Sequence, residues 1–534
     1  MKSAWSRRDL LKLSCAVVPA LAAGLVRIPV RAMTAAGGGA CEAAPGTPPK
    51  RQLRGVWIAT VSNIDWPSQP GLSIADQQAQ LRSLLDACVN ARLNSVYFQI
   101  RSVADAMYPT SYAPWSQALT GTQGQDPGYD PLAFAVAEAH RRNLELHAWM
   151  NPYRVSLQPD ASKLAPDNPA RLHPQWVVTY GQQIWFDPGI PDARRFLEDS
   201  ILDPLSRYDV DGLHFDDYYY PYPVAGITFP DDASFATYGS GFSDRGDWRR
   251  HNVNLLISEL SQRVHALKPW LKFGAAPFGV WRNQSTDPTG SATQAGAQDY
   301  DDLYADTRTW IRQEWLDYIA PEIYWAIGFA PAAYDVLVPW WSGEVAGTDV
   351  SLLIGEAAYK VGTSTQSPGW STTGELADHL ALDTGYPAVS GNILYNMSAV
   401  VANRLGFLTQ LEAGAYRYPA LVPVMPSLGG HAPAPPQIVS ARRTDQGTVL
   451  TWTPRPGPST PASFAVYRFP GQTRPPECDF DDPRNLVTAV RANAAQGPQT
   501  YVDAGPASGP QTYCVTALDR LHHESPASNP AVVA

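Results

Sequence analysis

The stretch DGLHFDDYYYPYP, residues Asp211–Pro223, joins a short apolar strand to a cluster of acidic and tyrosine side chains. Side chains along a strand alternate between its two faces. Leu213 and Phe215 are therefore expected on one face, while His214 and Asp216 are expected on the other. The pattern predicts a strand that packs against apolar neighbours on one side and carries an acid at its C-terminal end on the other.

Strands of a similar kind recur on both sides of this stretch, separated by helical patterns. The eight candidates are RGVWIAT (Arg54–Thr60), NSVYFQIR (Asn94–Arg101), LELHAWMNPYR (Leu144–Arg154), VDGLHFDDY (Val210–Tyr218), KFGAAPFGVW (Lys272–Trp281), DYIAPEIYW (Asp317–Trp325), SLLIGEAAY (Ser351–Tyr359) and GNILYNM (Gly391–Met397). Eight strand–helix units of this total length predict a (β/α)8 TIM barrel. The alternative is an open, doubly wound sheet, but no glycine-rich phosphate loop follows the first strand.

Capping signals mark the starts of helices between these strands. Ser73 and Asp76 open one helix, and Asp130 followed by a proline opens another over Leu132–Arg142. Two further helices are expected over Asn252–Leu267 and Asp302–Trp315. The alternation of strands and helices continues to about residue 418, which agrees with a barrel.

The chain of 534 residues is long enough for a barrel and an accessory domain. We expect the barrel over residues 52–420, a Pro/Gly linker over 421–436 and a small all-β domain over 437–534. The last segment resembles a fibronectin type III sandwich in its short strands and in four aromatic residues, Trp452, Tyr467, Tyr501 and Tyr513. It is either a sugar- or wall-binding module or a spacer.

The N-terminus has the features of an export signal. Ser6–Lys12 resembles a twin-arginine motif, and a short apolar stretch follows over Leu13–Val26. We expect a signal peptide over residues 1–32, cleaved near Ala32, and a flexible leader over 33–51. The mature protein is therefore expected to be periplasmic or secreted, with a retained N-terminal anchor as the alternative.

Composition narrows the class of function. The net charge of -10 argues against a nucleic-acid partner, because proteins that bind nucleic acids need a basic surface. The 17 Trp and 25 Tyr residues suit sugar binding, since sugar C–H faces pack on aromatic rings. The five cysteines show no zinc spacing, and we expect no cofactor. Cys478 and Cys514 could pair in an oxidising compartment.

Strand alternation also places polar groups inside the barrel on other strands. The residues expected to face inward are Tyr97, Gln99 and Arg101 on the second strand, His147, Trp149 and Asn151 on the third, and Glu322 and Tyr324 on the sixth. A purely structural barrel would fill these positions with Val, Ile and Leu. The pattern therefore predicts a functional site at the C-terminal ends of the strands, where barrel enzymes have theirs.

The reaction that fits best is glycoside hydrolysis. It uses two carboxyl groups, one as an acid and one as a nucleophile or base. Asp216 and Glu322 end strands on opposite sides of the barrel, and Asp217 lies next to Asp216. In a purely structural interpretation, Asp216 or Asp217 would form a salt bridge to Arg101 or Arg154 and orient other groups.

Metal binding is an alternative that uses some of the same residues. His147, His214, Asp216 and Asp217 could supply ligands, but the two histidines are not in a recognised ligand spacing. We therefore predict no metal site.

Five long motifs resemble the glycosyl-hydrolase-like family 10 proteins. They are RGVWIATVSNIDWP (Arg54–Pro67), FDDYYYPYP (Phe215–Pro223), PFGVWRN (Pro277–Asn283), YDDLYADTRTW (Tyr300–Trp310) and DYIAPEIYW (Asp317–Trp325). The resemblance implies a TIM barrel, export and glycosidase activity. It also implies a nucleophilic acid at the end of the fourth strand, Asp216, and an acid/base at the end of the sixth, Glu322. The family often has Gln at the second position, so Glu322 is alternatively a binding residue, with Asp217 or another loop acid as the proton donor.

A wider set of residues is expected to bind substrate around these acids. They are Trp57, Asp65, Trp66, Tyr97, Gln99, Arg101, His147, Asn151, Tyr153, Arg154, His214, Tyr218, Tyr222, Phe278, Trp281, Arg282, Tyr324 and Trp325. Arginines at such a site suggest carboxylates or acetamido carbonyls on the substrate. With export, this favours an envelope glycan such as peptidoglycan strands. A non-catalytic glycan-binding barrel and a metal-dependent hydrolase of another bond are the alternatives.

Overall fold

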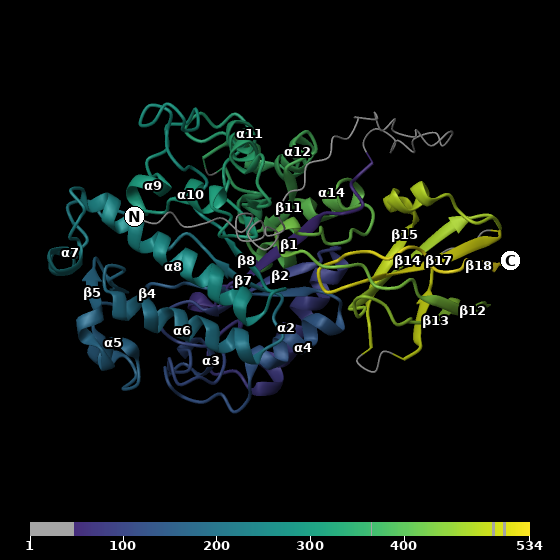
Figure 1. Ribbon diagram of the computed structural model, residues 1–534, viewed down its shortest axis with the longest axis horizontal. Coiled ribbons are helices and arrows are strands. Elements are labelled where there is room, and N and C mark those ends of the chain that lie inside the picture. Colours follow the sequence, from purple (N-terminus) through teal and green to yellow (C-terminus); the bar gives the residue numbers. More distant parts are fainter. Residues whose placement is uncertain (1–46, 365, 494–496, 506–508) are drawn as a thin grey trace, which may run out of the picture.

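The computed structural model describes residues 47–364, 366–493, 497–505 and 509–534 (Figure 1). The expected signal peptide over residues 1–32, and the leader as far as residue 46, lie outside the described residues.

Eight parallel strands close into a barrel, as the sequence predicts. They are β1 (Leu53–Ile58), β2 (Ser95–Arg101), β3 (Glu145–Met150), β7 (Gly212–Phe215), β8 (Lys272–Ala275), β9 (Tyr318–Ile319), β10 (Ser351–Glu356) and β11 (Val389–Leu394). Their order around the barrel is β1-β11-β10-β9-β8-β7-β3-β2. Each barrel strand therefore pairs with the barrel strand that comes next along the chain, and β11 pairs with β1 to close the barrel. The expectation of a TIM barrel is confirmed, and the open sheet is wrong.

Helices surround the barrel and fill the connections between strands (Figure 1). Their bounds are α2 (Ile74–Asn90), α3 (Gln117–Thr120), α4 (Pro131–Arg141), α5 (Pro169–Leu172), α6 (Pro191–Arg207), α7 (Asp232–Tyr238), α8 (Arg245–Leu267), α9 (Asp299–Asp302), α10 (Thr307–Arg312), α11 (Tyr334–Val345), α12 (Gly374–Asp383), α13 (Met397–Ala402) and α14 (Phe407–Ala413). A small antiparallel sheet in the connection after β3 contains β4 (Arg154–Ser156), β5 (Val177–Tyr180) and β6 (Gln183–Phe186).

Side-chain caps explain where several helices begin. The side chains of Ser73 and Asp130 accept hydrogen bonds from the backbone at the starts of α2 and α4, as expected. The helix expected from Asn252 begins earlier, at Arg245, because Asp244 caps it. The helix expected over 302–315 is shorter, Thr307–Arg312, because Asp306 caps it there, and the separate short helix α9 ends at Asp302.

The barrel interior holds a layer of large rings that glycines make room for. Tyr97, His147, His214 and Tyr318 are all fully buried there. A Cβ atom on Gly212 would lie 2.4 Å from Nδ1 of His147, and one on Gly274 would lie 2.1 Å from the Tyr318 ring. Because glycine has no Cβ atom, the rings occupy space that a side chain at these positions would otherwise take.

Hydrogen bonds link these rings into one chain along the barrel. Trp57 Nε1 donates to Nε2 of His214 at 3.0 Å, and Nδ1 of His214 lies 3.0 Å from the Tyr318 hydroxyl. The same hydroxyl lies 3.0 Å from Nδ1 of His147, whose Nε2 lies 3.3 Å from Glu145. Burial lowers the pKa of His214 well below its usual range, so this ring is neutral. The chain leads from the C-terminal ends of the strands to their N-terminal ends.

Gly274→Ala is expected to destabilise the protein by about 1–3 kcal/mol, since the new methyl group would overlap the Tyr318 ring. The hydroxyl contacts to both histidines restrict how far that ring can withdraw. Thermal or denaturant unfolding measures the change. Gly343→Ala is the matched control: Gly343 is exposed in α11, and its Cβ would meet nothing within 4 Å. Equal stability of Gly274→Ala and wild type would show that the ring layer is loosely packed.

After the barrel, two antiparallel sheets form a β sandwich, shown in green to yellow beside the label C in Figure 1. One sheet contains β12 (Gln437–Thr444), β13 (Gly447–Thr453) and β16 (Gln499–Asp503). The other contains β15 (Leu486–Arg491), β14 (Ser463–Pro470), β17 (Gln511–Leu518) and β18 (Ala531–Val533). Leu450 and Trp452 from the first sheet share a buried core with Phe464 and Val466 from the second.

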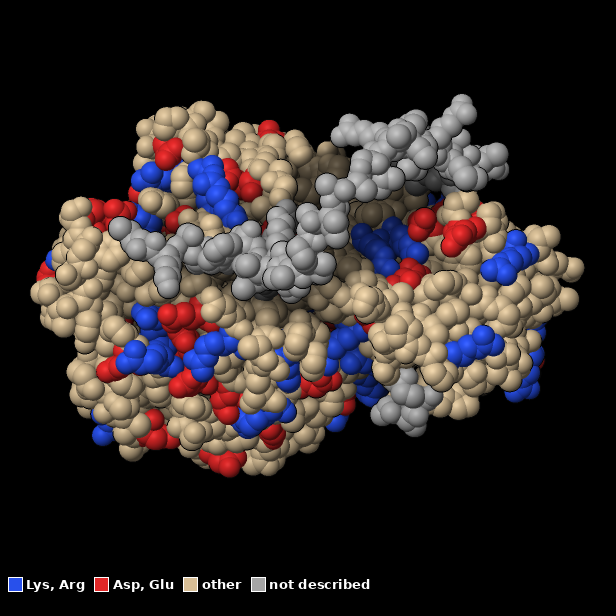
Figure 2. Space-filling model, viewed as in Figure 1, with Lys and Arg blue, Asp and Glu red and all other residues tan. Residues whose placement is uncertain are grey.

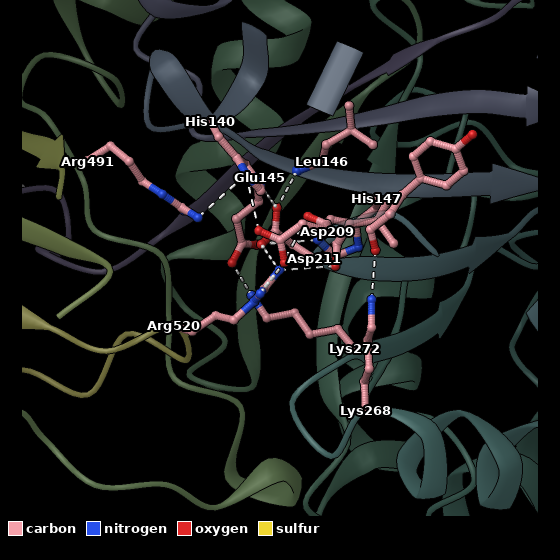
Figure 3. A network of polar contacts seen from close by, with 12 residues as sticks. His140, Glu145, Leu146, His147, Asp209, Asp211, Lys268, Lys272, Arg491 and Arg520 are labelled. Atoms are coloured by element: carbon pink, nitrogen blue, oxygen red, sulfur yellow. Dashed lines mark hydrogen bonds and ion pairs between the residues drawn. The ribbon is translucent and has the colours of Figure 1, made fainter. Parts of the chain in front are cut away.

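This sandwich is docked on the N-terminal end of the barrel through a buried polar network (Figure 3). Arg520, just after β17, forms ion pairs with Asp209 and Asp211 at the start of β7. His522 lies 2.6 Å from Glu145, which also pairs with Lys272. Burial opposes ionisation of Glu145, but Lys272 and His522 outweigh it and hold its pKa well below the usual range. The second domain therefore lies at the opposite end of the barrel from the C-terminal strand ends.

The segment between the two domains is partly buried. Met425 belongs to the cluster of apolar residues inside the barrel, together with Leu53 and Tyr318. Leu421 belongs to a second apolar cluster of the sandwich, separate from its core, together with Cys514, which is a buried free thiol. Cys478 is in a disulfide, so the pairing of Cys478 with Cys514 that we considered is wrong.

On the face drawn in Figure 2, basic and acidic side chains lie side by side over the barrel, without an extended basic patch among the described residues. No helix in the described part of the chain is long and apolar enough to cross a membrane.

Candidate active site

A cavity of about 500 Å³ opens at the C-terminal ends of the barrel strands. Its walls come from the ends of β1, β2, β3 and β11 and from the loops after β7, β8 and β9. The lining residues are Trp57, Val61, Ser62, Ile64, Gln99, Trp149, Arg154, Leu157, Asp216, Asp217, Tyr218, Tyr222, Phe278, Glu322, Tyr324, Trp325 and Tyr395. The cavity therefore brings all three expected catalytic acids together in one aromatic-walled site.

Asp216 is held as a hydrogen-bond acceptor. Its Oδ2 accepts from Nε1 of Trp149 at 3.0 Å and from Nδ2 of Asn151 at 2.6 Å. Gln99 donates to Asn151 at 3.0 Å and so orients the amide that contacts Asp216. Burial raises the pKa of Asp216, and the nearby Arg154 with these hydrogen bonds opposes the rise. The side chain is thus fixed in position at the floor of the cavity.

Asp217 has a different environment although it is the next residue. The backbone turns after β7, so both carboxyl groups reach the cavity. Burial and the negative charge of Asp216 together raise the pKa of Asp217 to about 7. The Tyr222 hydroxyl donates to its Oδ2. Adjacent carboxyls with different environments are a common way to obtain one acid and one base at neutral pH.

Glu322 lines the cavity from the loop after β9. It forms parallel bridges with Phe278 and Gly355, which continue the strand direction past the short β9. Burial, followed by the charges of Asp217 and Asp216, raises the pKa of Glu322 well above its usual range. Glu322 is therefore a second candidate proton donor.

Asp299 is a fourth acid that sequence reasoning missed. It begins α9 and is fully buried, and burial and the charge of Asp217 raise its pKa well above the usual range. Its charge also contributes to the raised pKa of Glu322. The only signal in the sequence is the acid run at Asp299–Asp302, which resembles an ordinary helix start.

Of the three expected arginines, one lines the cavity. Arg154 does so and lies over the Tyr218 ring at 4.4 Å. Arg101 points away and contacts Ser200 of α6, because the pairing of β2 with β3 shifts register between Gln99 and Arg101 and reverses the alternation. Arg282 forms ion pairs with Asp287 and Asp301 outside the cavity. The expectation that Arg101 faces inward is therefore wrong.

The other expected binding residues divide into two groups. Those that line the cavity are Trp57, Gln99, Tyr218, Tyr222, Phe278, Tyr324 and Trp325. Those that do not are Asp65, Trp66, Tyr97, His147, Asn151, Tyr153, His214 and Trp281. Tyr97, His147 and His214 face inward as expected but lie deeper in the barrel.

The remaining residues outside the cavity have contacts of their own. Asp65 accepts hydrogen bonds from the backbone of Ala59 and Ser398, both at 2.8 Å. Trp66 donates to the backbone of Gln77, and Tyr153 packs in the main apolar core. Trp281, in the loop after β8, stacks on Trp340 of α11. These residues shape the loops around the cavity without forming its wall.

Several lining residues were absent from the expected set. They are Val61, Ser62, Ile64, Trp149, Leu157 and Tyr395. Trp149 follows from strand alternation on β3, but the loop residues carry no periodic signal. Within the described residues, no group of three or more His, Cys, Asp or Glu side chains is arranged to hold a metal ion.

A closed parallel barrel with paired buried carboxyls in an aromatic cavity is an arrangement that glycoside hydrolases use. Residues 52–372 match the family described as Glycosyl hydrolase-like 10, and the chain belongs to that family.

Named relatives share much of the chain. It is 46% identical over 484 residues to Glycosyl hydrolase YngK of Bacillus subtilis (strain 168), covering 90% of this chain and 92% of YngK. It is 41% identical over 363 residues to Glycosyl hydrolase DigH of Escherichia coli (strain K12), covering 64% of this chain and 82% of DigH. Among solved structures, the PgaB (BpsB) glycoside hydrolase domain from Bordetella bronchiseptica is 14% identical with a TM-score of 0.44, covering 68% of this chain and 98% of that domain.

Proposed function

We propose that the protein hydrolyses glycosidic bonds of an envelope polysaccharide, with peptidoglycan strands as the best candidate substrate. The observation that carries the proposal is the pair Asp216 and Asp217, adjacent in sequence but held in different environments in one cavity. Membership of a glycosyl hydrolase-like family supports the reaction class.

Asp216 is the nucleophile or base in this mechanism. Its Oδ2 is fixed by Trp149 and Asn151, which leaves Oδ1 as the atom with the weaker contact, a 3.3 Å hydrogen bond from the Tyr218 backbone. A negative charge here stabilises the positive charge that develops on the sugar ring as the glycosidic bond breaks.

Asp217 is the preferred general acid. A carboxyl group whose pKa is about 7 is protonated in about half of the molecules at pH 7 and can give its proton to the departing sugar oxygen. Tyr222 holds the same carboxyl group in place by donating to Oδ2. Glu322 is the alternative acid, since its pKa is also raised.

The walls of the cavity support a sugar substrate. Rings from Phe278, Tyr324 and Trp325 are partly exposed in this wall and offer faces or edges on which pyranoses can pack. Arg154 brings a cation to this wall. Its Nε and Nη2 donate to the Ser102 backbone, and its Nη1 is the donor suited to a carboxylate or acetamido oxygen. The substrate argument from arginines now rests on Arg154, because Arg101 and Arg282 point elsewhere.

The experiment is incubation of the mature protein with purified peptidoglycan and with a panel of polysaccharides, followed by measurement of new reducing ends. We expect release from an envelope glycan, and the same release in the presence of a chelator. Binding without any release would favour a non-catalytic glycan-binding barrel. Loss of activity on chelation would favour a metal-dependent hydrolase.

Export and the second domain complete the proposal. The twin-arginine motif over Ser6–Lys12 supports export to the periplasm or beyond, where envelope glycans are found. We infer that the sandwich over residues 437–534 is a fibronectin type III-like domain. Its place at the N-terminal end of the barrel, with Arg520 and His522 in buried contacts, favours a structural role over direct contact with the bond that is cut.

A further inference from the structure

A second cavity, of about 290 Å³, lies beside the candidate active site. The two cavities share Val61, Ser62 and Leu157 in their walls. Val61 and Ser62 lie in the loop after β1, and Leu157 follows β4. The shared residues make the second cavity an extension of the first along the C-terminal face of the barrel. Its volume is near the lower end of the range for small-molecule sites.

The lining of this second cavity differs in chemistry from the active site. It has no aromatic ring, and it includes the cation Lys163. Many of its other polar groups are hydroxyls and amides, among them those of Ser102, Ser116, Ser156, Gln117, Gln123 and Gln158. Such groups both donate and accept hydrogen bonds, as sugar hydroxyl and acetamido groups do.

One buried acid also belongs to this lining. Asp105 is only 2% exposed, and burial raises its pKa to about 6. Hydrogen bonds from Ser116, Gln123 and the Gln117 backbone oppose this rise, so Asp105 orients polar groups that line the same cavity. The cavity is therefore a polar pocket whose wall is ordered around a buried acid.

Arg154 lines the active-site cavity and is hydrogen-bonded to a residue that lines the second cavity. Its Nε and Nη2 donate to the backbone oxygen of Ser102 at 3.1 and 3.0 Å, and Ser102 lines the second cavity. The same guanidinium lies over Tyr218 on the active-site side. A chain that passes Arg154 would thus contact both cavities at once.

We propose that the second cavity is a subsite for a further pyranose of the same glycan chain, bound through hydrogen bonds to its hydroxyl and acetamido groups. The inference rests on the proposed glycosidase function and deepens it. The aromatic cavity positions the bond to be cut, and the polar cavity holds the chain beyond it. The substrate is then an oligomer or polymer, and catalysis improves with chain length until both cavities are filled.

The test uses peptide-free oligosaccharides of N-acetylhexosamines, graded in length, with kcat/KM measured for each. Gln117→Trp would narrow the second cavity, because Gln117 lies in its wall. We expect the ratio of kcat/KM for long over short substrates to fall about tenfold, which corresponds to about 1.4 kcal/mol. Gln78→Trp is the matched control, on α2 at a residue that lines neither cavity, and it is expected to keep the wild-type ratio.

The outcomes separate this inference from the proposed function. Wild-type protein that cleaves no oligosaccharide of any length would overturn the proposed function itself. Wild-type protein that cleaves with a length dependence that Gln117→Trp does not change would overturn the subsite alone. Calorimetric binding to Asp216→Asn gives a readout without turnover: Gln117→Trp in that background is expected to weaken binding of long chains more than of short ones.

Discussion

Asp216→Asn is expected to lower kcat on the glycan substrate by about 10³-fold or more, equivalent to about 4 kcal/mol of transition-state stabilisation. Asparagine is nearly the same size as aspartate and can still accept from Trp149 and Asn151 through its amide oxygen. It carries no negative charge, so it cannot act as a base or nucleophile or stabilise a cationic sugar. Release of reducing ends over time measures the loss.

The control for this variant separates chemistry from folding and binding. Asp445→Asn makes the same substitution in the exposed turn between β12 and β13 and is expected to keep wild-type activity. Asp216→Asn should also unfold at a similar temperature and still bind the glycan. Retention of more than a tenth of wild-type turnover by Asp216→Asn would remove Asp216 from the reaction and return the assignment to Asp217 or Glu322.

The fold was predictable because its signals are periodic and repeated. Alternation of apolar and polar residues identified all eight strands, and side-chain caps at Ser73 and Asp130 marked helices between them. The errors lie where one side chain overrides the pattern. Asp306 starts a helix partway through a stretch whose pattern is continuous, and Asp244 starts another earlier than its apolar face suggests.

The site was predictable only as far as strand alternation reaches. The rule placed His214 and Asp216 on the same inner face of β7, and they do share it. The rule does not give the position of a side chain along the barrel axis. It therefore could not separate Asp216, which lines the cavity, from His214, which lies in the ring layer beneath it. It also fails at the register shift before Arg101, and it says nothing of loop residues such as Tyr395.

Asp299 shows a further limit of reasoning from sequence. It reaches the group of acids from a helix start rather than a strand end, and its effect on Glu322 is electrostatic. Such contributions depend on burial and on distance through space, which a one-dimensional pattern does not contain.

Asp217→Asn is expected to abolish the alkaline limb of the pH profile and to lower kcat/KM by about 10²–10⁴-fold. A general acid works only while it carries its proton. Because the pKa of Asp217 is about 7, wild-type kcat/KM should fall as pH rises through about 7. Asparagine does not titrate in this range, so the variant should keep a low and flatter rate there. Initial rates between pH 5 and 9 on a soluble oligosaccharide test this.

The same substitution is expected to stabilise the protein above neutral pH. The pKa of Asp217 rises from 3.8 in the unfolded chain to about 7 in the folded protein. Between about pH 4 and pH 7 the unfolded chain ionises this group while the folded protein keeps it protonated, so the free energy of unfolding of the wild type falls as pH rises through this range. The loss approaches, as an upper limit, about 4 kcal/mol above pH 7. The asparagine side chain is always neutral and can still accept from Tyr222, so the variant's advantage in unfolding free energy should be larger at pH 8 than at pH 4.

Substrates with a good leaving group distinguish a general acid from a merely structural residue. An aryl glycoside whose phenolate leaves without a proton needs no acid, so Asp217→Asn should lose far less activity on it than on a natural glycan. Glu322→Gln is the parallel variant. If it loses the alkaline limb and is rescued by the aryl substrate while Asp217→Asn is not, then Glu322 donates the proton. In that case the charge of Asp217 would act mainly by raising the pKa of Glu322.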